Sequence, residues 1–258
     1  MRLAGQVAWI TGTSSGIGRA VADRFAREGA AVLCSDVRPE PDPRGFDSGP
    51  PTHELIAAAG GRAAYVHCDV TDPAQTDAAL EACVEQFGRC DIHVANAGIA
   101  PAVRSLLEAD YAAYERVIEI NQNAVWRTCR AVAAQMVAQG GGGRIIALSS
   151  IAGLTGIDSG ADYVMSKHAV MGLVRVMSRQ LGPHGITVNA INPGYLRTAM
   201  NRESLDDPER TRFLIAEGSL PRLGEPADIA GAAAFLASGD AAWVTGIALP
   251  VDGGYTAR

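Results

Sequence analysis

Short runs rich in apolar and β-branched residues alternate along this chain with longer stretches of helical periodicity. Because parallel strands are joined by crossovers that are usually helices, the alternation predicts βαβ units. We therefore expect an α/β protein with a Rossmann-like, doubly wound fold, in which a seven-stranded parallel sheet carries helices on both faces. The expected strands are Val7–Thr11, Ala31–Asp36, Ala63–Cys68, Asp91–Ala95, Arg144–Ser149, Thr187–Asn192 and Ile247–Val251. The expected helices lie near Ile17–Glu28, Pro73–Phe87, Tyr111–Ala138, Tyr163–Leu181 and Pro226–Ala237.

Two segments interrupt this alternation. Arg38–Pro51 is rich in proline and glycine, so we expect a surface loop there rather than a linker between domains. Tyr195–Leu220 is polar and charged and follows a strand, at the edge where open α/β sheets bind ligands. We interpret residues 195–220 as a substrate-binding loop. The chain has 258 residues, which suits one large domain spanning 1–258.

Charge and composition limit the classes of partner. The net charge is −6, which does not favour nucleic acid or an anionic membrane, because phosphate binding depends on clustered Lys and Arg. No apolar run approaches the roughly 18 residues of a membrane span, and no signal-peptide pattern is visible, so we expect a cytoplasmic protein. The five cysteines lack a CxxC pair and the five histidines are scattered, so we expect neither disulfides nor a metal site.

A glycine-rich segment directly follows the first expected strand and opens the first helix. Glycines allow a tight turn and let the backbone approach a diphosphate, which the amides of a helix N-terminus attract. The alternative is a plain strand–helix turn, but the strand–loop–helix context favours a dinucleotide site. The segment reads Thr11-Gly12-Thr13-Ser14-Ser15-Gly16-Ile17-Gly18. Its expected cofactor contacts are Gly12, Ser14, Ser15, Gly16, Ile17 and Gly18.

Asp36 ends the second expected strand, about 20 residues beyond the glycines, where a carboxylate can accept both ribose hydroxyls of NAD. The same carboxylate would repel the 2′-phosphate of NADP. Ser15 is neutral and Val37 follows Asp36, so neither supplies the cation that an NADP site needs, although Arg38 lies nearby. We predict NAD, with NADP the less favoured cofactor.

Two further groups follow the third and fourth expected strands at the same edge of the sheet. Asp69 could accept a hydrogen bond from an adenine amino group, and Val70 could offer backbone contacts. Asn96, Ala97 and Gly98 follow the fourth strand on the cofactor side. Taken alone, each group is equally consistent with a turn or a helix cap.

Tyr163 and Lys167 are four residues apart in a helical stretch, so they share one face. An ammonium near a phenol favours the phenolate, and an oxidised nicotinamide would add to this effect, so the pair suits acid/base chemistry. Ser150, at the end of the fifth strand, can hydrogen-bond a substrate oxygen. Asn121 is a polar residue within a helix that could hold an ordered water. The alternatives are an exposed Tyr/Lys pair, a strand-end turn and a structural asparagine.

In these motifs the sequence resembles the short-chain dehydrogenase/reductase family, in its single-domain form. The resemblance covers most of the chain in the family's order, except that Ala95 stands where the family usually has a second asparagine. The residues that carry it are the glycine-rich segment, Asn96-Ala97-Gly98, Asn121, Ser150, Tyr163-Val164-Met165-Ser166-Lys167, Pro193-Gly194 and Val251-Asp252-Gly253-Gly254.

The resemblance implies a role for each matching residue. Tyr163 would be the acid/base, Lys167 would lower its pKa and hold the nicotinamide ribose, and Ser150 would bind the substrate oxygen. Asn121 would position a water that relays protons through Lys167. The residues expected around the nicotinamide are Pro193, Gly194, the backbone of Leu196, and Thr198. The family also implies a homotetramer built on the helices near Tyr111–Ala138 and Tyr163–Leu181 and on the last strand.

These features together predict an NAD-dependent oxidoreductase that interconverts a secondary alcohol and its ketone. Mainly small and apolar residues near the catalytic end favour a cyclic or hydrophobic substrate. The alternatives are an NADP-dependent ketoreductase of a biosynthetic pathway and a non-catalytic nucleotide sensor. The expected wall residues are Ala100, Pro101, Ile151, Gly153, Ile157, Tyr195 and the segment up to Leu220.

Overall fold

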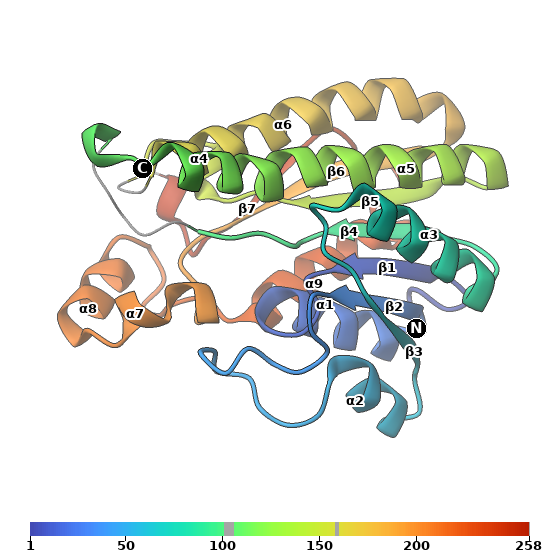
Figure 1. The fold of residues 1–258 in the computed structure, drawn as a ribbon, viewed down its shortest axis with the longest axis horizontal. Coiled ribbons are helices and arrows are strands. Elements are labelled where there is room, and N and C mark those ends of the chain that lie inside the picture. Colours follow the sequence, from blue (N-terminus) through green and yellow to red (C-terminus); the bar gives the residue numbers. More distant parts are fainter. Residues whose placement is uncertain (101–105, 158–159, 258) are drawn as a thin grey trace.

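The structure is a computed structural model that describes residues 1–100, 106–157 and 160–257. One sheet of seven parallel strands runs through it in the order β3-β2-β1-β4-β5-β6-β7 (Figure 1). The chain winds outward from β1 to β3 and returns to β4, so the order reverses between β1 and β4 and the doubly wound fold is confirmed. The strands are β1 Val7–Thr11, β2 Ala31–Asp36, β3 Arg62–His67, β4 Ile92–Ala95, β5 Gly143–Leu148, β6 Ile186–Pro193 and β7 Ala248–Val251.

Helices cover both faces of the sheet (Figure 1). Successive strand residues point to opposite faces, so Trp9 packs in the cluster shared with α3, α5 and α6, and Ile10 packs in the cluster shared with α1, α2 and α9. Burial on both faces explains why the strands are almost continuously apolar. The helices are α1 Gly16–Arg27, α2 Thr52–Ala58, α3 Pro73–Phe87, α4 Tyr111–Ile118, α5 Ala124–Gln139, α6 Ala161–Leu181, α7 Arg202–Leu205, α8 Pro208–Ala216 and α9 Pro226–Ala237.

The long helix expected over Tyr111–Ala138 is interrupted. A π-helical turn, Glu119–Asn123, separates α4 from α5. Asn121 lies in this turn with no exposed surface, and its side chain binds the backbone of Ile99 beyond the end of β4. Such turns widen a helix locally and often occur at functional sites. Here the turn accompanies a polar side chain directed into the protein.

The expectation of a loop over residues 195–220 is wrong. This part of the chain forms a short 3-10 turn, Ala199–Asn201, followed by α7 and α8. The Asp207 carboxylate caps the first turn of α8 by accepting from the amide of Glu209 at 2.8 Å, and Pro208 occupies the first helical position. The helix α2 was also not expected. By contrast, Arg38–Pro51 contains no helix or strand, as expected of a surface loop.

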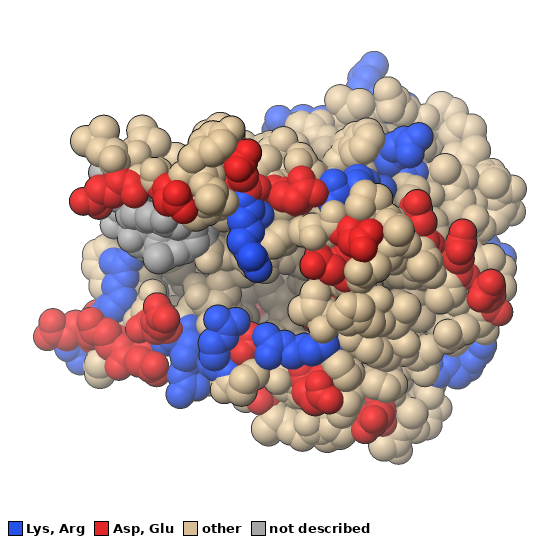
Figure 2. All heavy atoms as spheres, viewed as in Figure 1, with Lys and Arg blue, Asp and Glu red and all other residues tan. Residues whose placement is uncertain are grey.

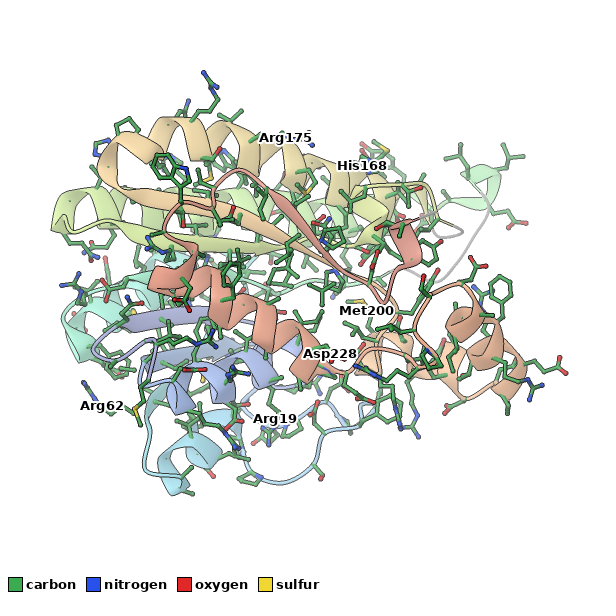
Figure 3. All side chains as sticks on the ribbon, turned by 180° about the vertical axis from the view of Figure 1, so that it is seen from behind. Arg19, Arg62, His168, Arg175, Met200 and Asp228 are labelled. Carbon is green, nitrogen blue, oxygen red and sulfur yellow. The ribbon has the colours of Figure 1, made fainter. Side chains whose placement is uncertain are left out.

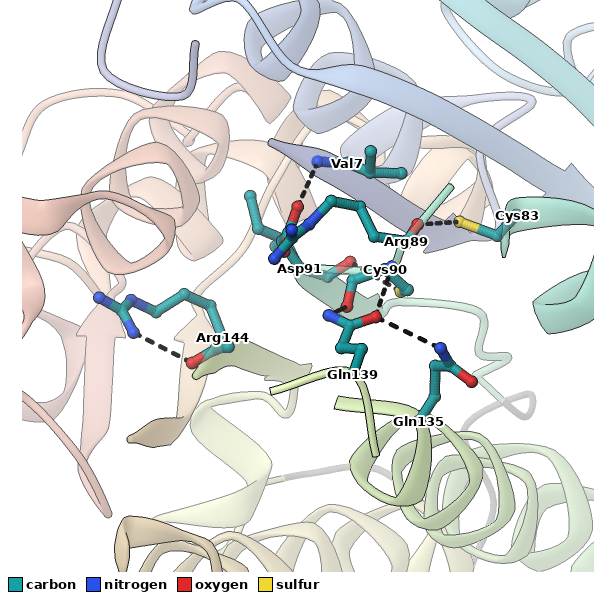
Figure 4. A network of polar contacts seen from close by, with 10 residues as sticks. Val7, Cys83, Arg89, Cys90, Asp91, Gln135, Gln139 and Arg144 are labelled. Carbon is teal, nitrogen blue, oxygen red and sulfur yellow. Dashed lines mark hydrogen bonds and ion pairs between the residues drawn. The ribbon is translucent and has the colours of Figure 1, made fainter. Parts of the chain in front are cut away.

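The amino ends of β1 and β4 are tied together on the edge opposite the glycine-rich turn (Figure 4). The Asp91 carboxylate accepts from the amide of Val7 at 3.0 Å and from Nε of Arg89 at 2.6 Å. Gln139, at the end of α5, bonds both the amide and the carbonyl of Cys90, at 3.1 and 2.9 Å. These contacts fix the strands against α5 and leave the other edge for the site.

Within the described ranges no helix has the length and apolar character needed to cross a membrane. Over the same residues, His, Cys, Asp and Glu side chains form no group of three suited to a metal ion. All five cysteines are buried free thiols.

Candidate active site

The glycine-rich turn closes tightly on itself and on the end of β4. Gly12 has a φ of 71°, and a Cβ on Gly18 would clash with the carbonyl oxygen of Gly12. The side-chain amide of Asn96 donates to the carbonyls of Thr11 and Gly12 at 2.8 and 3.0 Å. The Thr11 hydroxyl accepts from the backbone amides of Asn96 and Ala97, both at 3.0 Å. The residues after β4 therefore hold the glycine turn in shape.

The N-terminus of α1 holds an anionic oxygen in this structure. The first amides of a helix have no acceptor within it, and Ser15, just before the helix, makes no side-chain cap. The amide of Gly16 donates to the carboxylate of Asp47 at 2.7 Å. Thr198 borders the same turn, since a Cβ on Gly16 would lie 3.5 Å from its Cγ2. The N-terminus of α1 thus binds an anionic oxygen through a backbone amide, which is what a diphosphate-binding turn must do.

Asp36 lies beside the same turn, at the end of β2. Its Oδ2 accepts from the amide of Ser14 at 3.0 Å, and its Oδ1 accepts from the amide of Val37 at 2.8 Å. The Ser14 hydroxyl donates to the carbonyl of Arg38. The structure thus brings Ser14 and Asp36 together at the corner expected for the adenosine ribose.

Asp69 and Val70 serve a turn in this structure. Oδ1 of Asp69 accepts from the amide and the hydroxyl of Thr71, at 2.9 and 2.7 Å, and its amide donates to Oε1 of Gln75 at 2.9 Å. The carbonyl of Val70 accepts from Nη2 of Arg127 at 3.1 Å. The turn interpretation therefore accounts for these contacts, and a role in adenine binding stays a prediction.

Tyr163 and Lys167 lie on one face of α6, as their spacing predicts. Nζ of Lys167 lies 5.6 Å from the centre of the Tyr163 ring. Burial raises the pKa of Tyr163 above its ordinary value, and a hydrogen bond with the Ser150 hydroxyl partly opposes this. Burial therefore outweighs the contact with Ser150, and the expected lowering of this pKa by Lys167 stays a prediction. Nζ of Lys167 donates to the carbonyl of Leu148 at 3.0 Å.

Lys167 is the only lysine in the sequence, and it is buried. Burial lowers the pKa of Lys167 to about 8, so its ammonium can lose a proton far more readily than an exposed lysine. The hydroxyl of Ser149 donates to the carbonyl of Lys167 at 3.0 Å. His168, the next residue, is exposed, and its Nδ1 pairs with the carbonyl of Val164 at 2.9 Å, so it takes no part in this group (Figure 3).

Ser150 is held on both sides by the backbone around it. Its hydroxyl accepts from the amide of Ala152 at 3.1 Å, and its carbonyl accepts from Nδ2 of Asn192 at 2.7 Å. Asn192 is the penultimate residue of β6, has no exposed surface, and carries an Oδ1 without a partner in the described residues. Sequence reasoning did not single out Asn192 or Ser149. The sequence feature that could have indicated both residues is a polar side chain next to the buried, apolar end of a strand.

Asn121 contributes through protein contacts. Its Oδ1 accepts from the amide of Ile99 at 2.9 Å, and its Nδ2 donates to the carbonyl of Ile99 at 2.8 Å. Nδ2 also contacts the Ser166 hydroxyl at 3.4 Å, and that hydroxyl donates to the carbonyl of Tyr163 at 2.8 Å. Asn121 thus joins the end of β4 to the helix turn that carries Tyr163, and both of its N–H donors already have partners.

Pro193 and Gly194 close the far side of the site. A Cβ on Gly194 would lie 2.8 Å from the Cα of Asp252, so only glycine fits at this point. Leu196 is buried, and its carbonyl accepts from Nδ2 of Asn201 at 2.8 Å. Beyond Leu196 the chain reaches Thr198, which borders the glycine-rich turn.

The expected wall of the substrate pocket needs correction. Ile151 is only 2% exposed, and a Cβ on Gly153 would lie 2.7 Å from the carbonyl oxygen of Lys167, so neither lines open space. Pro101 lies outside the described residues. Tyr195 meets Tyr255 edge-on, with ring centres 5.6 Å apart. Both tyrosines line a cavity of about 140 Å³ together with Leu214, Ile215, Gly218, Leu220, Arg222, Leu223, Gly224, Asp228, Val251, Asp252 and Gly253.

A hollow lies on the face of the molecule shown in Figure 2. Basic side chains gather along one rim of the hollow, over the loop between β2 and α2, and acidic side chains gather over α7 and α8. This face carries the glycine-rich turn and the segment after β6, so the hollow lies where the expected cofactor and substrate residues meet.

A family model for enoyl-(acyl carrier protein) reductases matches residues 12–256. L-rhamnose 1-dehydrogenase (NAD(P)(+)) from Sphingomonas sp. is 39% identical over 98% of this chain and 96% of its own length. Cyclohexanol dehydrogenase from Acinetobacter sp. is 36% identical over the same shares of the two chains, 98% and 96%. A crystal structure of a short-chain type dehydrogenase/reductase from Mycobacterium marinum superimposes with a TM-score of 0.91 at 34% identity, covering 99% of this chain and 97% of that one.

This chain belongs to the short-chain dehydrogenase/reductase family. The match spans nearly the whole chain, which confirms the resemblance drawn from the motifs. As a short-chain dehydrogenase/reductase, the protein is an oxidoreductase, and relatives in the family are named for the oxidation of CH–OH groups with NAD or NADP.

Proposed function

We propose that the protein is an NAD-dependent dehydrogenase that interconverts a secondary alcohol and its ketone, with Tyr163 as acid/base. The observation that carries this proposal is the arrangement of three side chains. The Tyr163 phenol is hydrogen-bonded to Ser150, and its ring lies 5.6 Å from the ammonium of Lys167. A hydroxyl donor, a titratable phenol and a buried cation at one strand edge suit proton transfer to and from an alcohol oxygen.

The residues present fit a nicotinamide dinucleotide. Gly16 at the start of α1 already binds a carboxylate oxygen, and Asp36 stands at the ribose corner beside Ser14. We infer that Gly12, Ser15, Ile17 and Gly18 complete the cradle for the diphosphate, and that Lys167 and Thr198 face the nicotinamide half. When bound, the nicotinamide accepts or returns a hydride.

Within this site the chain's own residues handle the proton. Ser150 orients the substrate oxygen, and Tyr163 takes the hydroxyl proton during oxidation and returns it during reduction. Lys167 stabilises the phenolate by its positive charge. Because its pKa is about 8, its ammonium can also give up a proton near neutral pH. Asn121 and Ser166 hold the first turn of α6 in register with the end of β4.

Asp36 supports NAD over NADP. Its carboxylate has no ion-pair partner among the residues that the structure describes, so its charge is available to repel a 2′-phosphate. Arg38, the nearest cation along the chain, is paired with Asp42 at 3.5 Å instead.

A cyclic secondary alcohol is the proposed substrate class. Relatives are named for cyclohexanol and for L-rhamnose, which supports ring-shaped alcohols in general. Tyr163, Ser150 and Lys167 are not among the residues that line the cavity beside Tyr195 and Tyr255, so the proposed substrate class rests on the names of the relatives.

Substitution of Tyr163 by Phe tests the proposal. We expect Tyr163→Phe to lower turnover of a cyclic alcohol by at least about a thousandfold, because the proton acceptor is lost, while calorimetric NAD binding persists. Tyr111→Phe, at an exposed tyrosine, is the matched control and should keep full turnover. Near-normal turnover by Tyr163→Phe would exclude the assignment.

We also propose that the protein is a cytoplasmic homotetramer assembled partly through α5 and α6. Trp126 on α5 is half exposed and borders a hollow of about 400 Å³ lined by Gln122, Asn123, Arg127, Ala169, Val170 and Leu173. An exposed aromatic ring beside a hollow with both apolar and polar lining residues is typical of a protein interface. Sedimentation equilibrium tests the assembly: Trp126→Glu should shift the tetramer to smaller species, and a monomeric wild-type protein would contradict the proposal.

A further inference from the structure

The loop after β2 meets the ribose corner of the site at Arg38. The Ser14 amide binds the Asp36 carboxylate at 3.0 Å, and the Ser14 hydroxyl donates to the carbonyl of Arg38. Both ends of the Asp36–Arg38 stretch are therefore fixed to the same serine of the glycine-rich turn. The Arg38 side chain starts from the corner at which a phosphate on the adenosine ribose would lie.

Asp42 binds the guanidinium groups of two arginines. Its Oδ2 lies 3.5 Å from Nη2 of Arg38 and 2.7 Å from Nη2 of Arg44, and its Oδ1 accepts from Nε of Arg44 at 3.1 Å. The Asp42 side chain is only 12% exposed, while the Arg38 side chain is 43% exposed. A single shielded carboxylate thus holds the two cations of this loop.

The loop around Asp42 is built to keep that carboxylate in place. Oδ1 also accepts from the backbone amide of Arg44 at 2.9 Å, and the amide of Gly45 donates to the carbonyl of Asp42 at 2.8 Å. The hydrogen bond from Arg44 lowers the pKa of Asp42 to about 2, so the residue is ionised at any physiological pH. The loop is also anchored elsewhere, since Nη2 of Arg19 on α1 donates to the carbonyl of Ser48 at 3.3 Å.

A 2′-phosphate is recognised by a free guanidinium at this corner, because the planar group pairs with phosphate oxygens. A guanidinium already paired with a shielded carboxylate must break that pair first. The loop therefore contains the cations that an NADP site needs, together with a carboxylate that withholds them.

We propose that Asp42 is a specificity-determining residue that disfavours NADP by sequestering Arg38 from the 2′-phosphate. This inference rests on the proposed preference for NAD and adds a second source for it. Asp36 repels the phosphate directly, whereas Asp42 acts through Arg38.

Binding constants for NADPH and NADH, measured from nucleotide fluorescence, test the proposal without turnover. Asp42→Asn keeps an oxygen that can accept from the Arg44 amide, so the turn is preserved while the charge is lost. We expect this variant to bind NADPH at least tenfold more tightly and NADH within twofold of wild type. An unchanged ratio of the two constants would overturn the role of Asp42, even if wild type prefers NADH.

Three further variants test whether the gain in NADPH affinity comes from Arg38. Arg38→Gln added to Asp42→Asn should abolish this gain, whereas Arg44→Gln added to Asp42→Asn should retain most of it. The reverse pattern would overturn the assignment to Arg38. Arg38→Gln alone should leave the NADPH constant of wild type unchanged, because Arg38 is already paired, and this measurement holds even if Asp42→Asn folds poorly. Equal NADH and NADPH affinity in wild type would instead refute the NAD preference itself.

Discussion

Nζ of Lys167 lies 5.6 Å from the centre of the Tyr163 ring and donates to the carbonyl of Leu148 at 3.0 Å. The ammonium is therefore held under the ring by the end of β5, one turn along α6 from the phenol. Its hydrogen-bond acceptor among the described residues is a neutral carbonyl, and burial lowers the pKa of Lys167 to about 8.

The pKa of Lys167 can be measured directly, because the chain has no other lysine. Protein labelled with ¹³C-lysine should give one Cε resonance from the folded state, titrating near pH 8 rather than at the usual value of about 10.4. Below that midpoint the ammonium is charged and supports the phenolate, and above it the charge is lost. A midpoint at or above pH 10 would contradict the effect of burial. Urea-unfolded protein, in which the shift should vanish, is the control.

Asp47 should weaken cofactor binding through its charge. Its carboxylate lies 2.7 Å from the Gly16 amide, beside the place where a diphosphate would bind. Asp47→Asn keeps an acceptor for that amide but removes the repulsion, so we expect NADH affinity to rise by on the order of tenfold, about 1.4 kcal/mol. The difference should shrink in 1 M salt, where charges are screened. Unchanged or weaker binding at low salt would show that the carboxylate does not oppose the cofactor.

Asn192 should position Ser150. The Ser150 carbonyl accepts from Nδ2 of Asn192 at 2.7 Å and from the amide of Gly153 at 2.9 Å, so removing Nδ2 takes away one of two donors, which costs about 0.5–1.5 kcal/mol and loosens the segment that carries the catalytic hydroxyl. We expect Asn192→Ala to lower kcat about tenfold in steady-state assays while the NADH binding constant stays within twofold. Asn189→Ala is the matched control, because Asn189 bonds Val244 and Ile247 away from Ser150. Equal losses of kcat in both variants would point to a general loss of stability instead.

His93 should make the protein sensitive to mild acid. It is fully buried against Trp9, with Nε2 unpartnered in the described residues, and burial lowers the pKa of His93 from 6.5 to about 4. Between these values the unfolded chain binds a proton that the folded protein excludes, so stability falls as the pH falls from 6.5 to 4, by roughly 3 kcal/mol in all. Urea unfolding at several pH values measures this.

The variant His93→Phe should remove most of that pH dependence, since phenylalanine cannot take up a proton. His168→Gln, at an exposed histidine, should leave it intact. If His93→Phe kept the full acid sensitivity of wild type, the effect would have to come from other groups.

Much of the fold followed from local patterns. Apolar runs of strand length and helical periodicity are properties of neighbouring residues, so β1 and β2 were placed to the residue and α3 and α9 were bounded correctly. The interruption at Asn121 was missed because a π-helical turn depends on the contact with Ile99, which the local sequence does not encode. The polar composition of segment 195–220 indicates a loop, although Asp207 and Pro208 signal the start of a helix.

The sequence by itself determined the order of strands and helices, the glycine-rich turn and the shared face of Tyr163 and Lys167, because each depends on spacing within one element. Only the tertiary structure decided which distant groups meet. Asp47 reaches the Gly16 amide across 31 positions, and Asn192 reaches the Ser150 carbonyl across 42. Even the direction in which the pKa of Tyr163 shifts was decided by burial, which exists only once the chain is packed.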